Sequence, residues 1–391
     1  MSTALRLGST IGIMGGGQLG RMVALEARRV GYRTCVLDPD PRSPGGQVAD
    51  SSVVGSLSDP EAARELARRV DVVTYETENV DVRAALAAEV LVPLYPASSV
   101  LQITQDRIRE KTFLARLGLP VPKFAPIRSM ADLAGALRCL PFPLVLKTSS
   151  GGYDGKGQAI VHTSEEADVA FVRLAALCDT LILEELVDVT MELSVICARG
   201  VDGQIVSYPV SENHHTNGIL DVTLVPARVS SSISAQAREY AVEIVEQLGV
   251  VGLLAVEMFL VGGERLVINE MAPRPHNTGH YTLDACATSQ FEQLVRAVTR
   301  LPLGTTELYV PAVMVNLLGD LWSGPCPPNL PHALAVPGAR LYLYGKSRAF
   351  PGRKMGHLCC VADSLDVALV RALAARSGMR EGCATMDHRS P

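Results

Sequence analysis

Two acidic residues near a predicted hairpin turn could hold a divalent cation. Apolar strands flank Gly262-Gly263, with Glu257 in the first strand and Glu270 ending the second. A two-residue turn would pair Glu257 with Ile268, so that Glu270 lies one diagonal step away on the same face. Carboxylates that close repel each other, and Mg²⁺ bound jointly with nucleotide phosphates relieves the repulsion. We therefore predict Glu257 and Glu270 as metal ligands, joined by Asn269 if a bulge turns it inward. The alternative is a buried acid paired with Arg.

A second group of residues could surround a triphosphate. The apolar run 144–146 ends in Lys147, and the segment 151–157 contains four glycines and Lys156. Backbone amides and two ammonium groups can bind phosphates, and the glycines let such a loop close over them. The segment is not a Walker A loop, because the Gly-Lys-Ser/Thr ending and its helix are missing. A plain flexible hairpin is the alternative.

The strand predicted at 181–187 ends in paired acids. Glu184 and Glu185 could offer a carboxylate to ribose hydroxyls, while the backbone of Leu186 and Val187 meets adenine. Paired acids at a strand end are more often solvated, so this signal is weak by itself.

A glycine loop near the start of the chain raises a different possibility. Gly15-x-Gly17-x-x-Gly20 follows a predicted strand and opens a helix, and Asp38 ends the next strand. That spacing is typical of a dinucleotide site, which makes an NAD-dependent oxidoreductase a competing hypothesis. The same turn also occurs where a βαβ unit needs tight packing. Further on, Glu76 follows a strand at the edge where α/β sheets place ligands.

In this order, a lysine strand, a glycine-rich lid, an acidic strand end and a Glu…Asn-Glu pair resemble the ATP-grasp ligases. Four strings narrow the resemblance to the 5-(carboxyamino)imidazole ribonucleotide synthase family: Gly15 to Met22, Gln105 to Arg107, Gly151 to Gln158 and Asn269 to Thr282. The resemblance runs from about Ile11 to Ala362. It implies that ATP, Mg²⁺ (or Mn²⁺), bicarbonate and 5-aminoimidazole ribonucleotide combine through carboxyphosphate in purine biosynthesis. Another ATP-grasp carboxylase, a formyltransferase or a silent nucleotide-binding protein are the remaining alternatives.

The resemblance also implies roles for individual residues. It implies ATP contacts from Arg107, Lys147, Gly152, Tyr153, Asp154, Gly155, Lys156, Gly157, Gln158, Glu184, Glu185, Leu186, Val187, Glu192, His215, Asn269 and Glu270. It implies catalytic groups at Tyr153, Asp154, Arg274, His276 and Asn277. It implies ribonucleotide contacts from Gly17, Gln18, Glu76, Lys346, Arg353 and Lys354. His214 precedes His215 in the family's pattern, which leaves open which imidazole faces the nucleotide.

These residues require α/β elements to position them. Residues 10–38 are typical of a βαβ unit, and a helix is predicted from Gln105 to Leu117. We expect an α/β ATP-grasp fold with three domains: a Rossmann-like domain at 1–105, the ATP-grasp domain at 106–303 and a small β-rich domain at 304–391. The last domain ends in a frayed tail from about residue 377.

Bulk composition limits the other partners. The chain has 391 residues, 48% of them hydrophobic, and a net charge of -5, which supplies no positive field for nucleic acid or an anionic membrane. Its nine cysteines show no CxxC spacing, and no run is long enough for a membrane span. We expect a cytoplasmic enzyme, and the family resemblance implies a homodimer.

Overall fold

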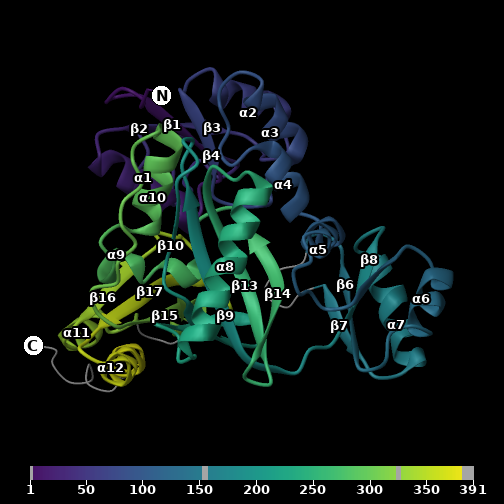
Figure 1. The fold of residues 1–391 in the computed structure, drawn as a ribbon. Coiled ribbons are helices and arrows are strands. Elements are labelled where there is room, and N and C mark those ends of the chain that lie inside the picture. Colours follow the sequence, from purple (N-terminus) through teal and green to yellow (C-terminus); the bar gives the residue numbers. More distant parts are fainter. Residues whose placement is uncertain (1–2, 152–156, 323–326, 381–391) are drawn as a thin grey trace, which may run out of the picture.

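The computed structural model describes residues 3–151, 157–322 and 327–380, and it contains three sheets with helices packed on them (Figure 1). The predicted residues Gly152, Tyr153, Asp154, Gly155 and Lys156 lie outside the described residues. No helix in the described ranges is long and apolar enough to cross a membrane.

The first sheet is parallel, with the strand order β3-β2-β1-β4. Its strands are β1 (Thr10–Met14), β2 (Arg33–Asp38), β3 (Ser51–Val54) and β4 (Val72–Tyr75). Four helices accompany it: α1 (Gln18–Arg29), α2 (Pro60–Ala67), α3 (Val82–Glu89) and α4 (Ser98–Thr104). The predicted βαβ unit over residues 10–38 is confirmed by the parallel pairing of β1 with β2.

The second sheet forms a small lobe that projects from the side of the molecule (Figure 1). Its order is β5-β8-β6-β7, built from β5 (Phe124–Ile127), β6 (Leu144–Thr148), β7 (Gln158–Val161) and β8 (Leu181–Glu185). The helices α6 (Met130–Leu137) and α7 (Ser164–Ala175) enclose its own apolar core. The lobe thus holds Lys147 and Glu184 on adjacent antiparallel strands.

The helix predicted from Gln105 to Leu117 is shorter than expected. The helix α5 (Arg107–Arg116) begins after Asp106, which separates it from α4. The Asp106 carboxylate accepts hydrogen bonds from the amides of Ile108 and Arg109. An N-cap of this kind starts a new helix.

The third sheet has nine strands in the order β14-β13-β9-β11-β12-β15-β17-β16, with β10 beside β9. They are β9 (Val189–Arg199), β10 (Ile205–Ser207), β11 (Ser211–Thr216), β12 (Ile219–Val225), β13 (Gly252–Val261), β14 (Arg265–Ala272), β15 (Ala312–Leu318), β16 (Ala339–Leu343) and β17 (Lys354–Val361). The associated helices are α8 (Ser231–Leu248), η1 (Asn277–Gly279), α9 (Thr282–Ala285), α10 (Gln290–Thr299), η2 (Gly319–Trp322), α11 (Leu330–Ala335) and α12 (Leu365–Gly378).

Strands from beyond residue 303 extend this third sheet. β15 pairs with β12 and carries β17 and β16, so the predicted small domain shares a sheet with the central one. The helix α12 runs to Gly378 and so includes the first two residues of the tail predicted from about residue 377; residues 381–391 lie outside the described part.

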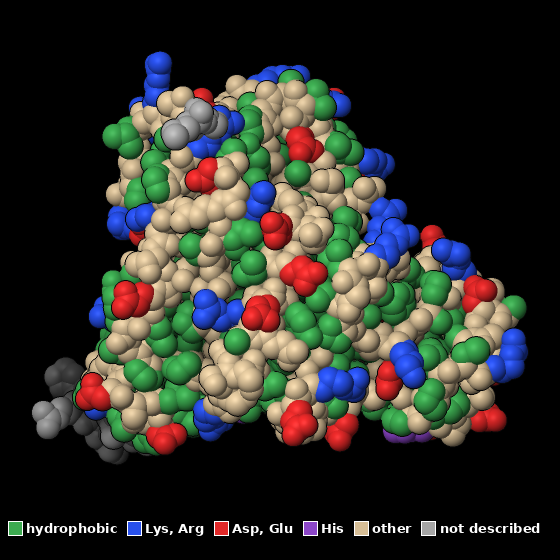
Figure 2. Space-filling model, in the orientation of Figure 1, with side chains coloured by type: hydrophobic (Ala, Val, Ile, Leu, Met, Phe, Trp, Pro, Cys, Tyr) green, Lys and Arg blue, Asp and Glu red, His purple; other side chains and the backbone are tan. Residues whose placement is uncertain are grey.

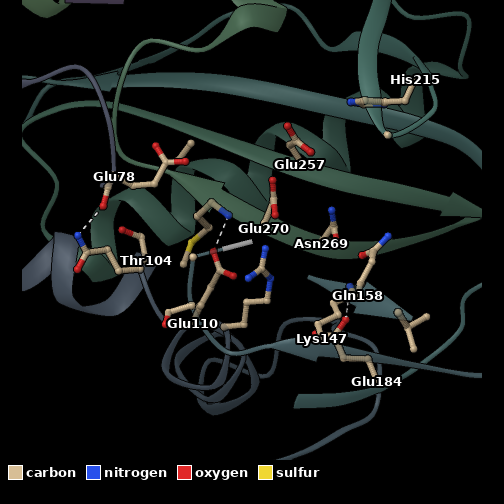
Figure 3. Close-up of a pocket in the computed structure, with 18 of the residues that line it drawn as sticks. Glu78, Thr104, Glu110, Lys147, Gln158, Glu184, His215, Glu257, Asn269 and Glu270 are labelled. Atoms are coloured by element: carbon tan, nitrogen blue, oxygen red, sulfur yellow. Dashed lines mark hydrogen bonds and ion pairs between the residues drawn. The ribbon is translucent and has the colours of Figure 1, made fainter. Parts of the chain in front are cut away.

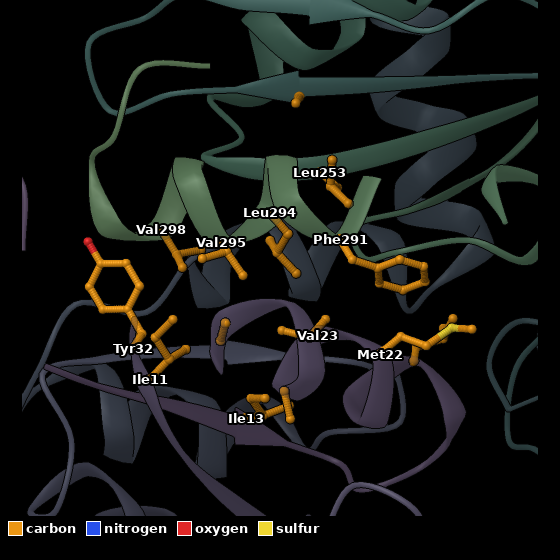
Figure 4. Close-up of a cluster of buried hydrophobic side chains, with 14 of the residues drawn as sticks. Ile11, Ile13, Met22, Val23, Tyr32, Leu253, Phe291, Leu294, Val295 and Val298 are labelled. Atoms are coloured by element: carbon orange, nitrogen blue, oxygen red, sulfur yellow. The ribbon is translucent and has the colours of Figure 1, made fainter. Parts of the chain in front are cut away.

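One apolar core joins the first sheet to the third (Figure 4). Met22 and Val23 of α1 meet Phe291, Leu294 and Val295 of α10, and each of these side chains is buried. On the surface, acidic and basic side chains are interspersed over the face in Figure 2, so neither sign of charge dominates it.

Candidate active site

A cavity of about 690 Å³ lies between the lobe, the large sheet and the loops that follow β4 and α4. Most of the described residues predicted to act on ATP or bicarbonate line it. They are Arg107, Lys147, Gln158, Glu184, Glu185, Leu186, Val187, Glu192, His215, Glu257, Asn269, Glu270, Arg274, His276 and Asn277, together with Lys354 from the predicted ribonucleotide group. Segments up to about 250 residues apart in sequence therefore converge on one space.

The predicted acidic pair lies on the hairpin β13–β14, with a register that differs from the expected one. Val261 pairs with Arg265, so the turn has three residues, and Glu257 pairs directly with Glu270. The predicted pairing of Glu257 with Ile268 is wrong, because the longer turn and a bulge at Asn269 each add one residue to β14. The bulge brings the two carboxylates directly opposite each other (Figure 3).

The electrostatics of this pair fit a divalent cation. Burial, together with the charge of Glu257, raises the pKa of Glu270. Burial also acts on Glu257, but a hydrogen bond from His276, whose Nε2 lies 3.1 Å from Glu257 Oε1, lowers its pKa. No cluster of three or more His, Cys, Asp or Glu side chains suited to a metal occurs in the described ranges. Two carboxylates with nucleotide phosphates are nevertheless a usual Mg²⁺ environment.

Cationic side chains lie around Glu184: Lys147 and Arg107 line the cavity, and Lys111 is buried behind it. Lys147 Nζ lies 2.6 Å from Glu184 Oε2, and Lys111 Nζ lies 3.8 Å from Glu184 Oε1. Burial alone would raise the pKa of Glu184, yet Lys111 and Lys147 lower it below its ordinary value. Arg107 reaches the same region and donates to the Thr148 carbonyl at 3.1 Å. These side chains can neutralise a polyphosphate.

The two histidines of β11 point to different environments. His215 lines the cavity, and its Nδ1 contacts Glu192 at 2.5 Å. Burial opposes the charged imidazole, but Glu192 raises the pKa of His215 above its usual value. His214 contacts Glu212 and is half exposed. The strand has a bulge between the two residues, and of the two only His215 lines the cavity.

An ion pair orients Arg274 at the end of the cavity near the first sheet. Its guanidinium donates to both carboxylate oxygens of Glu78, and its Nη2 lies 2.8 Å from Glu78 Oε1. Although burial opposes it, Arg274 lowers the pKa of Glu78 to about 2. Glu78 was not among the predicted site residues, although it belongs to the same strand-end segment as Glu76.

Sequence reasoning also missed Glu110 and Lys111, which are buried on α5. Lys111 Nζ donates to the carbonyls of Ile268 and Asn269, at 3.3 and 2.6 Å, and Glu110 Oε1 accepts from the amide of Met271 at 2.6 Å. Burial raises the pKa of Glu110 to about 8. These adjacent residues therefore hydrogen-bond to the backbone of β14 on both sides of Glu270. Their position one turn before the buried Leu114 was the signal available in the sequence.

The carboxylate of Glu76 occupies the glycine loop at residues 15–20. Glu76 accepts hydrogen bonds from the amides of Gly17 and Gly20, at 2.8 and 2.9 Å, and Asp38 accepts one from Gly16 at 2.7 Å. A side chain at Gly15 would collide with Glu76, whose Cγ lies 2.6 Å from the Cβ position. The amides that a dinucleotide would need are therefore engaged, which removes the structural basis of the oxidoreductase hypothesis.

Six predicted residues that the structure describes do not line the cavity: Gly17, Gln18, Glu76, Gly157, Lys346 and Arg353. Lys346 Nζ donates to the carbonyl of Lys354 at 2.6 Å, and Arg353 donates to the carbonyl of Arg348. Burial, reinforced by Arg353, lowers the pKa of Lys346 to about 8, while Glu76 opposes this shift. Lys346 thus lies between the cavity residue Lys354 and the glycine loop.

Three protein-family models match consecutive parts of the chain. They are the ribonucleotide synthetase preATP-grasp domain at residues 8–105, the ATP-grasp domain at 112–291 and the phosphoribosylaminoimidazole carboxylase C-terminal domain at 312–371.

Similar full-length proteins are known. The N5-carboxyaminoimidazole ribonucleotide synthase of Bacillus subtilis is 47% identical over 353 residues, which cover 90% of this chain and 91% of the relative. The ADP complex of an N5-carboxyaminoimidazole ribonucleotide synthetase superposes with a TM-score of 0.90 at 45% identity, covering 96% of this chain and 98% of the other. An Aspergillus clavatus synthase in complex with ADP and 5-aminoimidazole ribonucleotide gives a TM-score of 0.86 at 33% identity, with 96% and 99% covered.

Proposed function

The chain belongs to the N5-carboxyaminoimidazole ribonucleotide synthase family of ATP-grasp enzymes, and from this premise we propose that it carboxylates 5-aminoimidazole ribonucleotide with ATP and bicarbonate. The products are ADP, phosphate and the N-carboxylated ribonucleotide of purine biosynthesis. The observation that carries the proposal is the convergence of Glu257, Glu270 and Lys147 on one cavity that Arg274 and His276 also line.

The first step is phosphoryl transfer. An oxygen of bicarbonate attacks the γ-phosphorus, the bond to the β-phosphate oxygen breaks, and ADP leaves with the electron pair. Charge spread over the transferring oxygens needs positive groups, for which Lys147 and Arg107 are suited by their places on the cavity wall. Mg²⁺, which Glu257 and Glu270 would hold, supplies further neutralisation of phosphate charge when bound.

The second step transfers the carboxyl group. The exocyclic amine of the ribonucleotide attacks the carbon of carboxyphosphate, the carbon–oxygen bond to phosphate breaks, and the amine loses a proton. Arg274 and Asn277, which line the cavity, are proposed to bind the carboxyl oxygens, while His276 orients Glu257. The 5′-phosphate of the ribonucleotide is proposed to bind to Lys346, Arg353 and Lys354.

Coupling of ADP formation to both other substrates tests this proposal. ADP release should depend on 5-aminoimidazole ribonucleotide and bicarbonate, with one acid-labile carboxylated product per ADP. Equal ADP release without the ribonucleotide, or product formation from formate in place of bicarbonate, would contradict it. A homodimer and a cytoplasmic location are further proposals drawn from the family, and light scattering of the purified protein tests the first.

A further inference from the structure

Behind His276 runs a chain of buried polar side chains that the reaction scheme above does not use. Thr223 Oγ1 donates to Asn213 Oδ1 at 3.0 Å, and Asn213 Nδ2 donates to Ser194 Oγ at 3.0 Å. Ser194 Oγ donates to Thr278 Oγ1 at 2.9 Å, and Thr278 Oγ1 lies 2.9 Å from His276 Nδ1. All five residues are less than 10% exposed. The chain therefore links β12, β11, β9 and η1 to a residue of the cavity.

The order of donors and acceptors fixes where the protons lie. A hydroxyl group has one proton to donate, and Ser194 gives its proton to Thr278 while receiving one from Asn213. The proton of Thr278 is then available for His276 Nδ1, and we infer that this nitrogen is the acceptor. The ring proton of a neutral His276 consequently lies on Nε2, the atom 3.1 Å from Glu257 Oε1.

Sheet pairing explains why this chain ends at the proposed metal site. Ser194 is the cross-strand partner of Glu257, and Asn213 is that of Thr223, so their side chains share faces of the sheet. The backbones of these strands are already paired, so the hydrogen bonds between these side chains are not needed to complete the sheet. Buried polar groups in series are costly unless each is satisfied, and replacing bonded polar groups with apolar groups of the same shape is often neutral for stability. The chain therefore calls for a role beyond stability.

We propose that Thr278, Ser194 and Asn213 are positioning residues that hold His276 as the Nε2–H tautomer, which donates to Glu257 and thereby orients that carboxylate at the proposed metal site. The hydrogen bond at Nδ1 prevents rotation of the ring, and the bond at Nε2 fixes the direction of the Glu257 carboxylate. This inference rests on the proposed carboxylation for its effect on rate. The tautomer itself is independent of it.

Removal of the Thr278 hydroxyl group tests the role of this hydrogen-bonded series. Thr278→Val keeps the side-chain shape but removes the donor to Nδ1, and kcat should fall by about 10- to 100-fold with the Michaelis constant for ATP unchanged. Thr278→Ser restores the hydroxyl group and should recover kcat to within about threefold of wild type. Thr299→Val is the matched control, because Thr299 is equally buried but bonds only to backbone carbonyls of α10. It should leave kcat unchanged.

The tautomer provides a readout that needs no turnover. In protein labelled with ¹⁵N-histidine, the imidazole signal assigned by its loss in His276→Gln should show a protonated Nε2 in wild type and a mixture of tautomers in Thr278→Val. A protonated Nδ1 in wild type would overturn the inference even if Thr278→Val fails to fold. It would also be overturned if Thr278→Ser were as impaired as Thr278→Val, or if Thr299→Val lost as much activity. An inactive wild type with the expected tautomer would instead contradict the proposed function alone.

Discussion

Glu257 and Glu270 face each other across one rung of the β13–β14 ladder, and their environments differ. His276 donates to Glu257, whereas burial, reinforced by the neighbouring Glu257 carboxylate, raises the pKa of Glu270. Divalent cation binding is the simplest way to keep both groups charged near neutral pH.

Replacing Glu270 with Gln should lower kcat by about 10²- to 10³-fold or more, because a charge next to the transferring phosphate is lost. The melting temperature should not fall, since the substitution also removes repulsion with Glu257. Glu264→Gln, an exposed change in the turn of the same hairpin, should have no effect. Near-normal kcat of Glu270→Gln at saturating Mg²⁺ would rule out the metal role.

The lowered pKa of Lys346 predicts a pH dependence of ribonucleotide capture. Its ammonium is charged below about pH 8 and loses its charge above it, so kcat/KM for the ribonucleotide should fall as pH rises through that value. Lys346→Arg should remove the fall, because Arg stays charged. A wild-type profile that is flat between pH 7 and 9 would count against a phosphate contact at this residue.

Loss of that contact should also appear directly in substrate affinity. Lys346→Ala and Arg353→Ala should each raise the Michaelis constant for the ribonucleotide about 10-fold, since a charge-assisted hydrogen bond to phosphate contributes about 1.5 kcal/mol or more. The constant for ATP should stay nearly unchanged. If both constants rise together, or neither changes, these residues are not the phosphate-binding group.

At the scale of elements, α5 holds β14 in the shape that the site needs. Lys111 and Glu110 bond to the backbone on either side of Glu270, and the bulge at Asn269 is one of the positions they hold. The sequence predicted the two acids, the hairpin and their shared face. It could not predict the register, because the bulge at Asn269 is held by a partner 158 residues away in the chain. Likewise, the glycine spacing alone could not reveal that Glu76 fills the loop.

Lys111→Met should therefore be strongly destabilising and should impair Mg²⁺-dependent activity together with stability. The change leaves two carbonyls and part of Glu184 without a buried partner, at a cost of about 3–5 kcal/mol. Chemical denaturation measures this cost, and Lys123→Met on the exposed surface is the control. A loss below about 1 kcal/mol would show that α5 does not secure β14.

At the scale of the whole molecule, the first and third sheets share one apolar core, and this core sets the distance between the glycine loop and the cavity. Leu294 of α10 is fully buried in it, next to the side chains of α1 (Figure 4). Because the core contains residues of all three predicted domains, including Tyr344 of the last one, the sheets should unfold together. The sequence indicated the domains but not the core that they share, since an amphipathic helix does not reveal what covers its apolar face.

Leu294→Ala should lower the free energy of unfolding by about 2–5 kcal/mol while preserving a single transition. Leu25→Ala, on the exposed side of α1, should change it by less than about 0.5 kcal/mol. Two separate transitions in the wild-type protein would show that the sheets are not one cooperative unit.

The fate of the bicarbonate oxygen shows directly whether carboxyphosphate forms in the cavity. If carboxyphosphate forms in the cavity, the phosphate released on carboxylation keeps the bicarbonate oxygen that attacked the γ-phosphorus. Turnover in ¹⁸O-labelled bicarbonate should then give phosphate with one ¹⁸O atom per ADP formed, measured by ³¹P NMR or mass spectrometry. Phosphate free of ¹⁸O, formed while the ribonucleotide is carboxylated, would show that carboxyphosphate is not the intermediate.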